Sequence, residues 1–317
     1  MRVYTTIITS NYIGYALTLR ESLQPYGRLL FYLLIADDGP VDKEALAKDY
    51  PDVRLLFIND LCREGMGKAL LEKYQQSYID GFRWSMKPVL LKYLLNQEGH
   101  DRALFLDPDL FFFSDPGFLF DALQTDDFIL TPHWRARDPF RDSNNFYKLF
   151  KEGQYNAGFV GASKQAGPIL DWWASACLFH CSKDPGKALY VDQAYLNLLP
   201  IYFDRVRIIR QRGCNVAEWS RTENARKRDN GTILVGGDPL VFMHFTQGTI
   251  ETIARGDDPV LEPCLEQYEQ TANRYGIRLQ KIPPPPQLST AERLLPAFLL
   301  RPLRKIKWMF IKPESQQ

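Results

Sequence analysis

FLDPDLFFFSDP, the stretch from Phe105 to Pro116, places two carboxylates between two apolar runs. Residues i and i+2 of an extended segment face the same side, so Asp107 and Asp109 are predicted to point in one direction, with Pro108 stiffening the link between them. Two carboxylates this close repel each other unless a cation neutralises them. A hard divalent ion that also binds phosphate oxygens is a natural partner, and the alternative is a simple Asx turn between two strands.

On the N-terminal side of this stretch, strand and helix patterns alternate at the pitch of βαβ units. Short apolar runs that end in polar turns predict the strands Val3–Thr9, Leu29–Ala36, Val53–Ile58 and Ala103–Leu106. Apolar residues at helical spacing predict the helices Tyr15–Gln24, Asp42–Tyr50, Gly67–Tyr78 and Met86–Asn96. The pattern predicts an α/β fold whose central sheet is mainly parallel and covered on both faces.

The C-terminal side of the stretch is more mixed. The strands predicted there are Phe128–Thr131, Phe159–Ala162, Arg205–Arg210, Thr232–Val235 and Leu240–Phe245. The helices predicted there are Ala166–Phe179, Val191–Leu199 and Val260–Tyr275. The sequence contains no internal repeat. It also contains neither a G-x-G-x-x-G loop nor a Walker loop, which are common phosphate-binding motifs.

Polar residues follow the ends of several predicted strands. Because ligands gather at the carboxyl ends of parallel strands, these side chains are expected to converge on one edge of the sheet. They are Asn11, Asp37, Asp38 and Asp107.

Several single residues farther along the chain are candidates for the same site. His244 lies inside an apolar strand, either as a third metal ligand or as an ordinary core histidine. Asn156 offers both a donor and an acceptor, or belongs to a plain polar turn. His133 ends a strand and either lines the second-substrate side of the same site or is a surface residue, and Trp219 is either a ring that stacks on a ligand or part of the core. Asp192 near a predicted helix start is a functional carboxylate or a plain helix cap.

Composition and charge exclude several classes of function. The chain has 317 residues, of which 45% are hydrophobic, and its net charge of +1 gives no reason to expect nucleic acid as a partner. Five irregularly spaced cysteines favour buried thiols and a reducing compartment. The N-terminus lacks the pattern of a signal peptide, and no apolar run is long enough to span a membrane. A cytoplasmic location is therefore expected.

Residues 283–317 are expected to lie apart from a catalytic domain formed by residues 1–282. Pro283–Pro286 predicts a stiff spacer, and after it six Lys and Arg stand against two Glu, a net +4. Residues 294–310 combine basic and apolar side chains in the manner of interfacial membrane segments. This helical tail is expected to contact the cytoplasmic face of a membrane, and the alternative is a helix docked on its own domain.

The motifs FLDPDLFFFSDP, YNAGF, VDQAYLN and FMHF occur in this order, and TSNYIGYALTLRESL, SMKPVLLKYLL and GCNVAEW add to the set. Over Val3 to Gly248 the set resembles the GT-A glycosyltransferases, which have a Rossmann-like nucleotide-diphospho-sugar transferase fold. Within them it is most similar to the retaining, family-8-like bacterial enzymes that build surface polysaccharides. Two departures are Pro108 between the two aspartates and Ser10-Asn11-Tyr12 in place of an Asp-containing run.

The resemblance implies a nucleotide-sugar donor, with UDP favoured, and a Mn²⁺ or Mg²⁺ ion held by Asp107, Asp109 and His244. Asp192 and Gln193 match catalytic positions, and the Gln193 amide oxygen would stabilise an oxocarbenium-like transition state with retention of configuration. The resemblance and the strand ends together give the expected donor-binding residues Thr9, Asn11, Asp37, Asp38, Lys87, Asp107 and Asn156.

The sequence thus predicts a metal-dependent hexosyltransferase that acts on a glycan or lipid-linked acceptor in surface polysaccharide or lipopolysaccharide synthesis. Two alternatives belong to other classes. The first is a nucleotidyltransferase or sugar-nucleotide hydrolase, although Thr9 to Tyr12 lacks the Gly-rich loop with a lysine that nucleotidyltransferases commonly use. The second is a catalytically silent relative that binds a sugar nucleotide or glycan.

Overall fold

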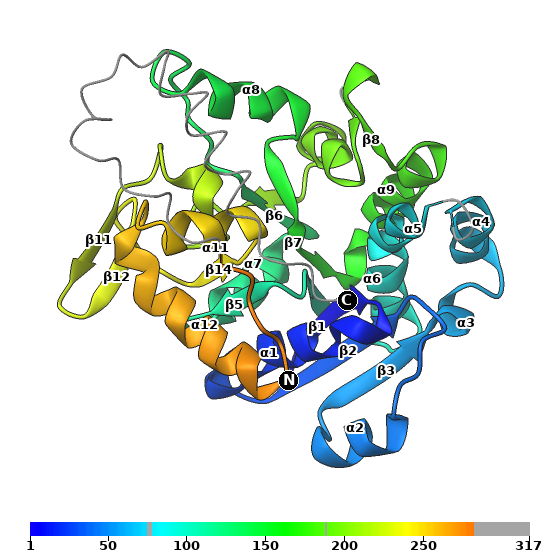
Figure 1. The fold of residues 1–317 in the computed structure, drawn as a ribbon. Coiled ribbons are helices and arrows are strands. Elements are labelled where there is room, and N and C mark those ends of the chain that lie inside the picture. The colour runs from blue at the N-terminus through cyan, green and yellow to red at the C-terminus, as the bar shows by residue number, and fades with distance from the viewer. Residues whose placement is uncertain (75–77, 188, 282–317) are drawn as a thin grey trace, which may run out of the picture.

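Seven strands form the central sheet in the computed structural model, which describes residues 1–74, 78–187 and 189–281 (Figure 1). Their order is β10-β6-β7-β4-β1-β2-β3. Every neighbouring pair is parallel except the two that involve β7, which confirms the predicted mainly parallel sheet. The strands are β1 (Arg2–Ile8), β2 (Leu29–Ile35), β3 (Val53–Phe57), β4 (Arg102–Leu106), β6 (Phe128–Pro132), β7 (Tyr155–Ser163) and β10 (Val206–Ile208).

Smaller elements surround this sheet. Short antiparallel pairs and a three-stranded sheet contain β5 (Leu110–Phe112), β8 (Lys183–Asp184), β9 (Leu189–Tyr190), β11 (Arg226–Asp229), β12 (Thr232–Val235), β13 (Asp238–Pro239) and β14 (Phe242–His244). The α-helices are α1 (Ile13–Leu23), α2 (Lys43–Asp49), α3 (Ile58–Leu61), α4 (Gly65–Tyr74), α5 (Ile79–Ser85), α6 (Lys87–Asn96), α7 (Gly117–Thr125), α8 (Ser143–Lys151), α9 (Gly167–Phe179), α10 (Leu199–Tyr202), α11 (Gln247–Ala254) and α12 (Glu262–Arg274). The 3₁₀ segments are η1 (Ser10–Tyr12), η2 (Gln24–Tyr26), η3 (Lys164–Ala166), η4 (Pro185–Lys187), η5 (Gln193–Leu198), η6 (Glu218–Ser220) and η7 (Pro259–Leu261).

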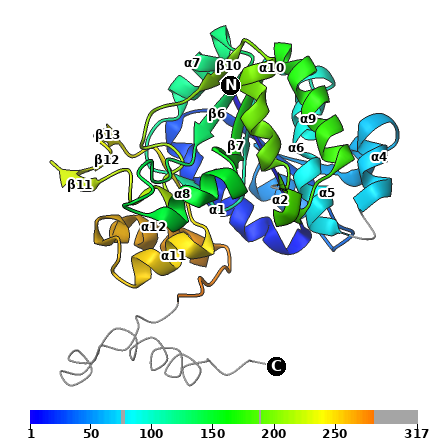
Figure 2. The same cartoon turned by 90° about the horizontal axis from the view of Figure 1, so that it is seen from above.

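Both faces of the central sheet are buried, which explains why its strands read as continuous apolar runs. Successive side chains of a strand point to opposite faces, so Ile7 joins one core and Ile8 the other. The first core contains Leu90 of α6 and Trp173 of α9, and the second contains Leu17 of α1. Figure 2 shows α4, α5, α6 and α9 grouped on one side of the molecule, away from α11 and α12.

A third core fixes the strand that carries His244. β14 pairs antiparallel with β5, and this register places His244 opposite Leu110, directly after the two aspartates. Behind the pair, the rings of Phe245 and Tyr268 stack with their centroids 4.0 Å apart, which holds α12 against the strand. The position of His244 therefore depends on contacts with β5 and α12, which are distant from each other in the sequence.

One predicted helix differs from the observed elements. The helix predicted over Gly67–Tyr78 corresponds to α4 (Gly65–Tyr74), and its continuation over residues 75–77 lies outside the described residues. The helix predicted over Val191–Leu199 is mostly the 3₁₀ segment η5, followed by α10. Pro200 has no N–H to continue an α-helical ladder from η5, and it lies in the first turn of α10 instead.

Residues 283–317, with the predicted spacer and tail, lie outside the described residues. Within the described ranges, no helix has both the length and the apolar character that a membrane span requires.

Candidate functional site

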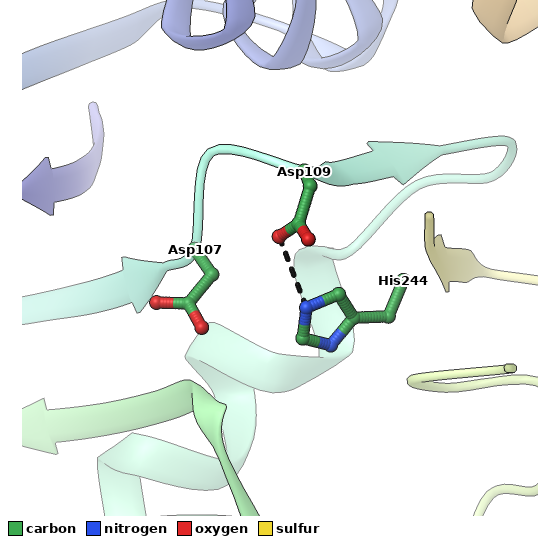
Figure 3. Close-up of side chains that lie close together, drawn as sticks. All are labelled: Asp107, Asp109 and His244. Carbon is green, nitrogen blue, oxygen red and sulfur yellow. Dashed lines mark ion pairs between the residues drawn. The ribbon is translucent and has the colours of Figure 1, made fainter. Parts of the chain in front are cut away.

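The three predicted metal ligands meet at the carboxyl end of the central sheet (Figure 3). Asp107 follows β4, Asp109 precedes β5 and His244 ends β14. One ligand atom from each lies within 4.8 Å of the others. The Asp107 carbonyl accepts a 3.1 Å bond from the N–H of Leu110, so the segment is also a tight turn. The turn and the cluster are therefore compatible, because the turn is what brings the side chains together.

Asp109 and His244 form an ion pair, with 3.0 Å between Asp109 Oδ1 and His244 Nε2. Burial lowers the pKa of His244, but the neighbouring Asp109 carboxylate outweighs burial and the net pKa is raised. Burial likewise raises the pKa of Asp109, and His244 outweighs it so that the net pKa is lowered. When His244 is protonated, its imidazolium places positive charge beside the two adjacent carboxylates.

The residues of this cluster also fit a divalent cation. Two carboxylates and one imidazole form a donor set that suits Mn²⁺ or Mg²⁺. In the described part of the chain, the buried His244 Nδ1 has no hydrogen-bond partner. A side chain on Gly158 would place its Cβ 2.6 Å from His244 Cε1 and 2.8 Å from Asp107 Oδ2, so only glycine leaves space there.

Lys87 joins this cluster to Asp192. Its ammonium lies 3.4 Å from Asp107 Oδ1 and 3.3 Å from Asp192 Oδ2, and it donates to the Ala157 carbonyl at 3.0 Å. Burial lowers the pKa of Lys87, but the two carboxylates outweigh burial and raise it. Burial raises the pKa of Asp192 to about 6, although Lys87 opposes that shift. Within the described residues the Asp192 side chain makes no helix-cap hydrogen bond, so it is not a plain cap.

Gln193 is held by a network that begins in β7. Its Oε1 accepts bonds from Ala157 N at 3.0 Å and from Asn156 Nδ2 at 3.2 Å, and its Nε2 donates to the Glu152 carbonyl at 2.7 Å. Asn156 Oδ1 in turn accepts from Gly158 N at 2.9 Å. The orientation of the Gln193 amide is therefore fixed by the protein.

His133 and Trp219 are buried beside this network. His133 Nδ1 lies 2.9 Å from the Gly153 carbonyl and must donate to it, so Nε2 is free to accept from Asn156 Nδ2 at 3.3 Å. The Trp219 ring meets the rings of His133 and His244 edge to face, with centroids 5.2 and 5.4 Å away. Trp219 therefore packs against His244, and His133 packs against Trp219. His133 is buried, so its interpretation as a surface residue is wrong.

His133 is expected to weaken the protein in acid. Burial lowers the pKa of His133 from 6.5 to about 3. Between these values the unfolded chain binds the proton and the folded protein does not, so stability falls as pH falls through this window. The loss on going from pH 7 to pH 5 is about 2 kcal/mol. Urea unfolding of wild type and His133→Gln at both pH values measures it. An equally steep acid loss in the variant would contradict this assignment.

The four residues predicted after β1 and β2 separate into two groups. Asp37 accepts bonds from Ser10 N at 2.7 Å and Ser10 Oγ at 2.8 Å, and Thr9 Oγ1 donates to Asn11 Oδ1 at 2.6 Å. Asp37 and Asp38 line a neighbouring cavity of about 690 Å³ with Lys43. Asp37 thus contacts the segment after β1 and also lines the second cavity with Asp38, and none of these four residues lines the cavity that Asp107 and Asp109 share.

A cavity of about 320 Å³ opens beside the cluster of Asp107, Asp109 and His244. Of its lining residues, the sequence prediction named Lys87, Asp107 and Asp109 as site residues, and it missed Tyr12, Tyr15, Arg83 and Trp84 among the others. Arg83 stands four residues before Lys87, a helical spacing that was available as a signal. The complete lining is Ile7, Tyr12, Tyr15, Arg83, Trp84, Lys87, Phe105, Asp107, Pro108, Asp109, Phe245, Gln247 and Ile250.

Comparison with known proteins identifies the fold. No family model matches the chain. It is 27% identical over 295 residues to the uncharacterised protein YfnF of Bacillus subtilis (strain 168), covering 89% of this chain and 95% of YfnF. It is 26% identical over 256 residues to YfnD of the same strain, covering 78% of each chain.

Two solved structures show the same arrangement of elements. One is the galactosyltransferase LgtC in complex with donor and acceptor sugar analogs, with a TM-score of 0.56, 15% identity, and coverage of 89% of this chain and 97% of LgtC. The other is mouse xyloside xylosyltransferase 1, with a TM-score of 0.50, 12% identity, and coverage of 78% of this chain and 98% of that chain. The fold is therefore the GT-A fold.

Proposed function

Because the chain has the GT-A fold, we propose that it is a metal-dependent glycosyltransferase. It would move a hexose from a UDP-sugar to a glycan or lipid-linked acceptor with retention of configuration. The observation that carries the proposal is the meeting of Asp107, Asp109 and His244 beside a cavity at the carboxyl edge of the sheet. A proposed role in surface polysaccharide or lipopolysaccharide synthesis, on the cytoplasmic face of a membrane, rests on the resemblance and on the composition of residues 294–310.

The solved relatives support this choice of reaction. LgtC was crystallised with donor and acceptor sugar analogs, and an active-site mutant of LgtC replaces a glutamine by glutamate. That mutant structure has a TM-score of 0.51 to this chain. The candidate site contains its own buried glutamine, Gln193, between Asn156 and the backbone of Ala157.

Asp107, Asp109 and His244 would hold the Mn²⁺ or Mg²⁺ ion. When bound, the ion supplies positive charge that stabilises the leaving nucleoside diphosphate. Lys87 keeps Asp107 in place, and the Gly158 position leaves the ligands room. The protein's contribution is thus a set of ligands whose positions are fixed before the donor arrives.

Gln193 and Asp192 would act on the transferred sugar. The fixed amide dipole of Gln193 is suited to stabilising positive charge that develops at the anomeric carbon. An amide is a poor nucleophile, so retention would follow from acceptor attack on the face that the diphosphate leaves, with the departing phosphate taking the acceptor proton. Asp192 and Asn156 would bind the sugar hydroxyls from their buried positions.

Calorimetric titration of UDP into the protein, with Mn²⁺ and with EDTA, tests the proposal. Metal-dependent binding, followed by transfer from a UDP-sugar to an acceptor, is the expected result. Binding without turnover against any acceptor would instead support a silent binding protein, and release of free sugar phosphate would support a hydrolase. Failure of UDP, GDP and dTDP to bind in the presence of Mn²⁺ would overturn the proposal.

Gly158→Ala is expected to disturb the metal ligands directly. The new methyl would lie 2.6 Å from His244 Cε1 and 2.7 Å from Asn156 Oδ1, so these neighbours must move. Overpacking of this kind costs about 1–3 kcal/mol, and a displaced ligand lowers metal affinity roughly 10- to 100-fold. Mn²⁺ titration and thermal unfolding measure both effects. Gly167→Ala is the matched control because open space surrounds that position. Unchanged Mn²⁺ affinity in Gly158→Ala would contradict the placement.

A further inference from the structure

The ammonium group of Lys87 is already saturated by the protein. It has three N–H donors, and it faces the Ala157 carbonyl at 3.0 Å and the carboxylates of Asp107 and Asp192 at 3.4 and 3.3 Å. Only 3% of Lys87 is exposed. The ammonium therefore balances the carboxylates of Asp107 and the buried Asp192, and little of its charge remains for a ligand in the cavity.

Arg83 is the other cation of this cavity. Among the described residues that line it, Lys87 and Arg83 alone carry positive charge. Arg83 lies on α5, four residues before Lys87, in a segment that continues directly into α6. The two side chains therefore reach the same cavity from successive turns.

The guanidinium of Arg83 is only partly engaged. Its Nη2 lies 2.5 Å from Asp80 Oδ1, and within the described residues its buried Nε has no hydrogen-bond partner. Asp80 is 45% exposed, and pairs this open to water contribute little to stability. A guanidinium has five N–H donors in a planar fork, so Arg83 can bind phosphate oxygens and still contact Asp80.

The rest of the cavity wall suits a nucleotide. Tyr12 and Tyr15 stack with their ring centroids 5.1 Å apart, and Trp84 stands beside Arg83 in the same lining. Asp107 and Asp109 lie on the wall of the same space. A ligand that fits has an aromatic group and an anionic group able to share a cation with the carboxylates.

We infer that Arg83 is the phosphate-binding cation of the donor site, and that Lys87 is a positioning residue that holds Asp107 and Asp192. This inference rests on the proposed function, because it assigns a contact within the proposed UDP-sugar site. The Arg83 guanidinium would contact the diphosphate in the cavity that it shares with Asp107 and Asp109, and Asp80 would orient the guanidinium. The substrate feature that Arg83 recognises is the diphosphate, independent of the sugar and the base.

The test compares UDP with uridine in the presence of Mn²⁺. A charge-assisted hydrogen-bond pair predicts that Arg83→Gln weakens UDP binding about 10- to 100-fold, measured by calorimetry. Uridine lacks the diphosphate, so its affinity, measured by NMR titration, is expected to change less than about 2-fold. Arg83→Lys keeps the charge without the fork and is expected to fall between wild type and Arg83→Gln. Arg63→Gln, an exposed arginine outside the cavity lining, is the control and should bind UDP like wild type.

Each result decides the question. If wild type and Arg83→Gln bind UDP equally tightly, the inference is wrong and the proposed donor site stands. Equal loss of uridine and UDP would show a structural role for Arg83 and would also overturn the inference. If wild type binds none of UDP, GDP and dTDP with Mn²⁺, the proposed function itself fails. Thermal unfolding of the variants verifies that each is folded before affinities are compared.

Discussion

Asp109→Asn is expected to remove metal-dependent nucleotide binding and to lower glycosyl transfer by at least about 10³-fold, since a bound metal supplies several kcal/mol of charge stabilisation. Asparagine has nearly the volume of aspartate but brings no negative charge to the cation. Asp109 also lies 3.0 Å from His244 in an ion pair, so the variant loses the carboxylate that raises the pKa of this imidazole. Both the ligand and its orientation are affected.

Titration of Mn²⁺ and UDP, together with turnover of a UDP-sugar, measures the effect of this substitution. Asp115→Asn is a matched control, because Asp115 belongs to the same stretch but pairs with Arg2 at 2.5 Å outside the cluster. We expect Asp115→Asn to retain wild-type affinity for UDP and Mn²⁺. Full activity of Asp109→Asn would show that the mechanism does not need a metal at this position. Asp107 and Asp109 would then serve only to form the turn between β4 and β5.

Lys87→Met is expected to destabilise the fold by about 3–5 kcal/mol, the usual effect of removing one partner of a buried ion pair. Methionine fills similar space but leaves Asp192, which is 1% exposed, without its cation. Burial already raises the pKa of Asp192 to about 6 in the presence of Lys87. Without the lysine that carboxyl must take up a proton or remain as an uncompensated buried charge.

Urea unfolding at neutral pH measures this loss, and a double variant identifies its cause. Lys87→Met combined with Asp192→Asn leaves a neutral pair, so it is expected to be more stable than Lys87→Met alone. Lys92→Met, which breaks an exposed pair with Asp171, controls for the loss of a lysine and should change stability by less than about 1 kcal/mol. If Lys87→Met were as stable as Lys92→Met, Lys87 would not balance the buried carboxylate of Asp192.

Most of the central sheet was predictable because its signals are local. Leu29–Ala36 and Ala103–Leu106 are short apolar runs closed by polar turns, and both predictions match strands, β2 and β4, to within a residue. Helical spacing located α6 and α9 for the same reason. The prediction differs from the structure where the local signal depends on neighbouring residues, as in the 3₁₀ segment before Pro200.

The candidate site was predictable to a smaller extent. Asp107 and Asp109 are two residues apart, so any extended backbone brings their side chains to one side. Arg83 and Trp84 were missed because an arginine and a tryptophan on a helix are compatible with an ordinary surface, and only the cavity gives them a role. The environment of His133, buried between Gly153 and Trp219, likewise has no counterpart in the sequence pattern.

The sequence by itself determined the α/β class, the parallel strands and the carboxylate pair, because periodicity and spacing act over a few residues. The tertiary structure alone decided that His244 reaches Asp109, because that contact depends on the register of β14 against β5 and on the packing of α12 behind them. It also decided that the charge of Lys87 is directed at Asp107 and Asp192. Such charge pairs join segments far apart in the chain, and their geometry is set by the packed core.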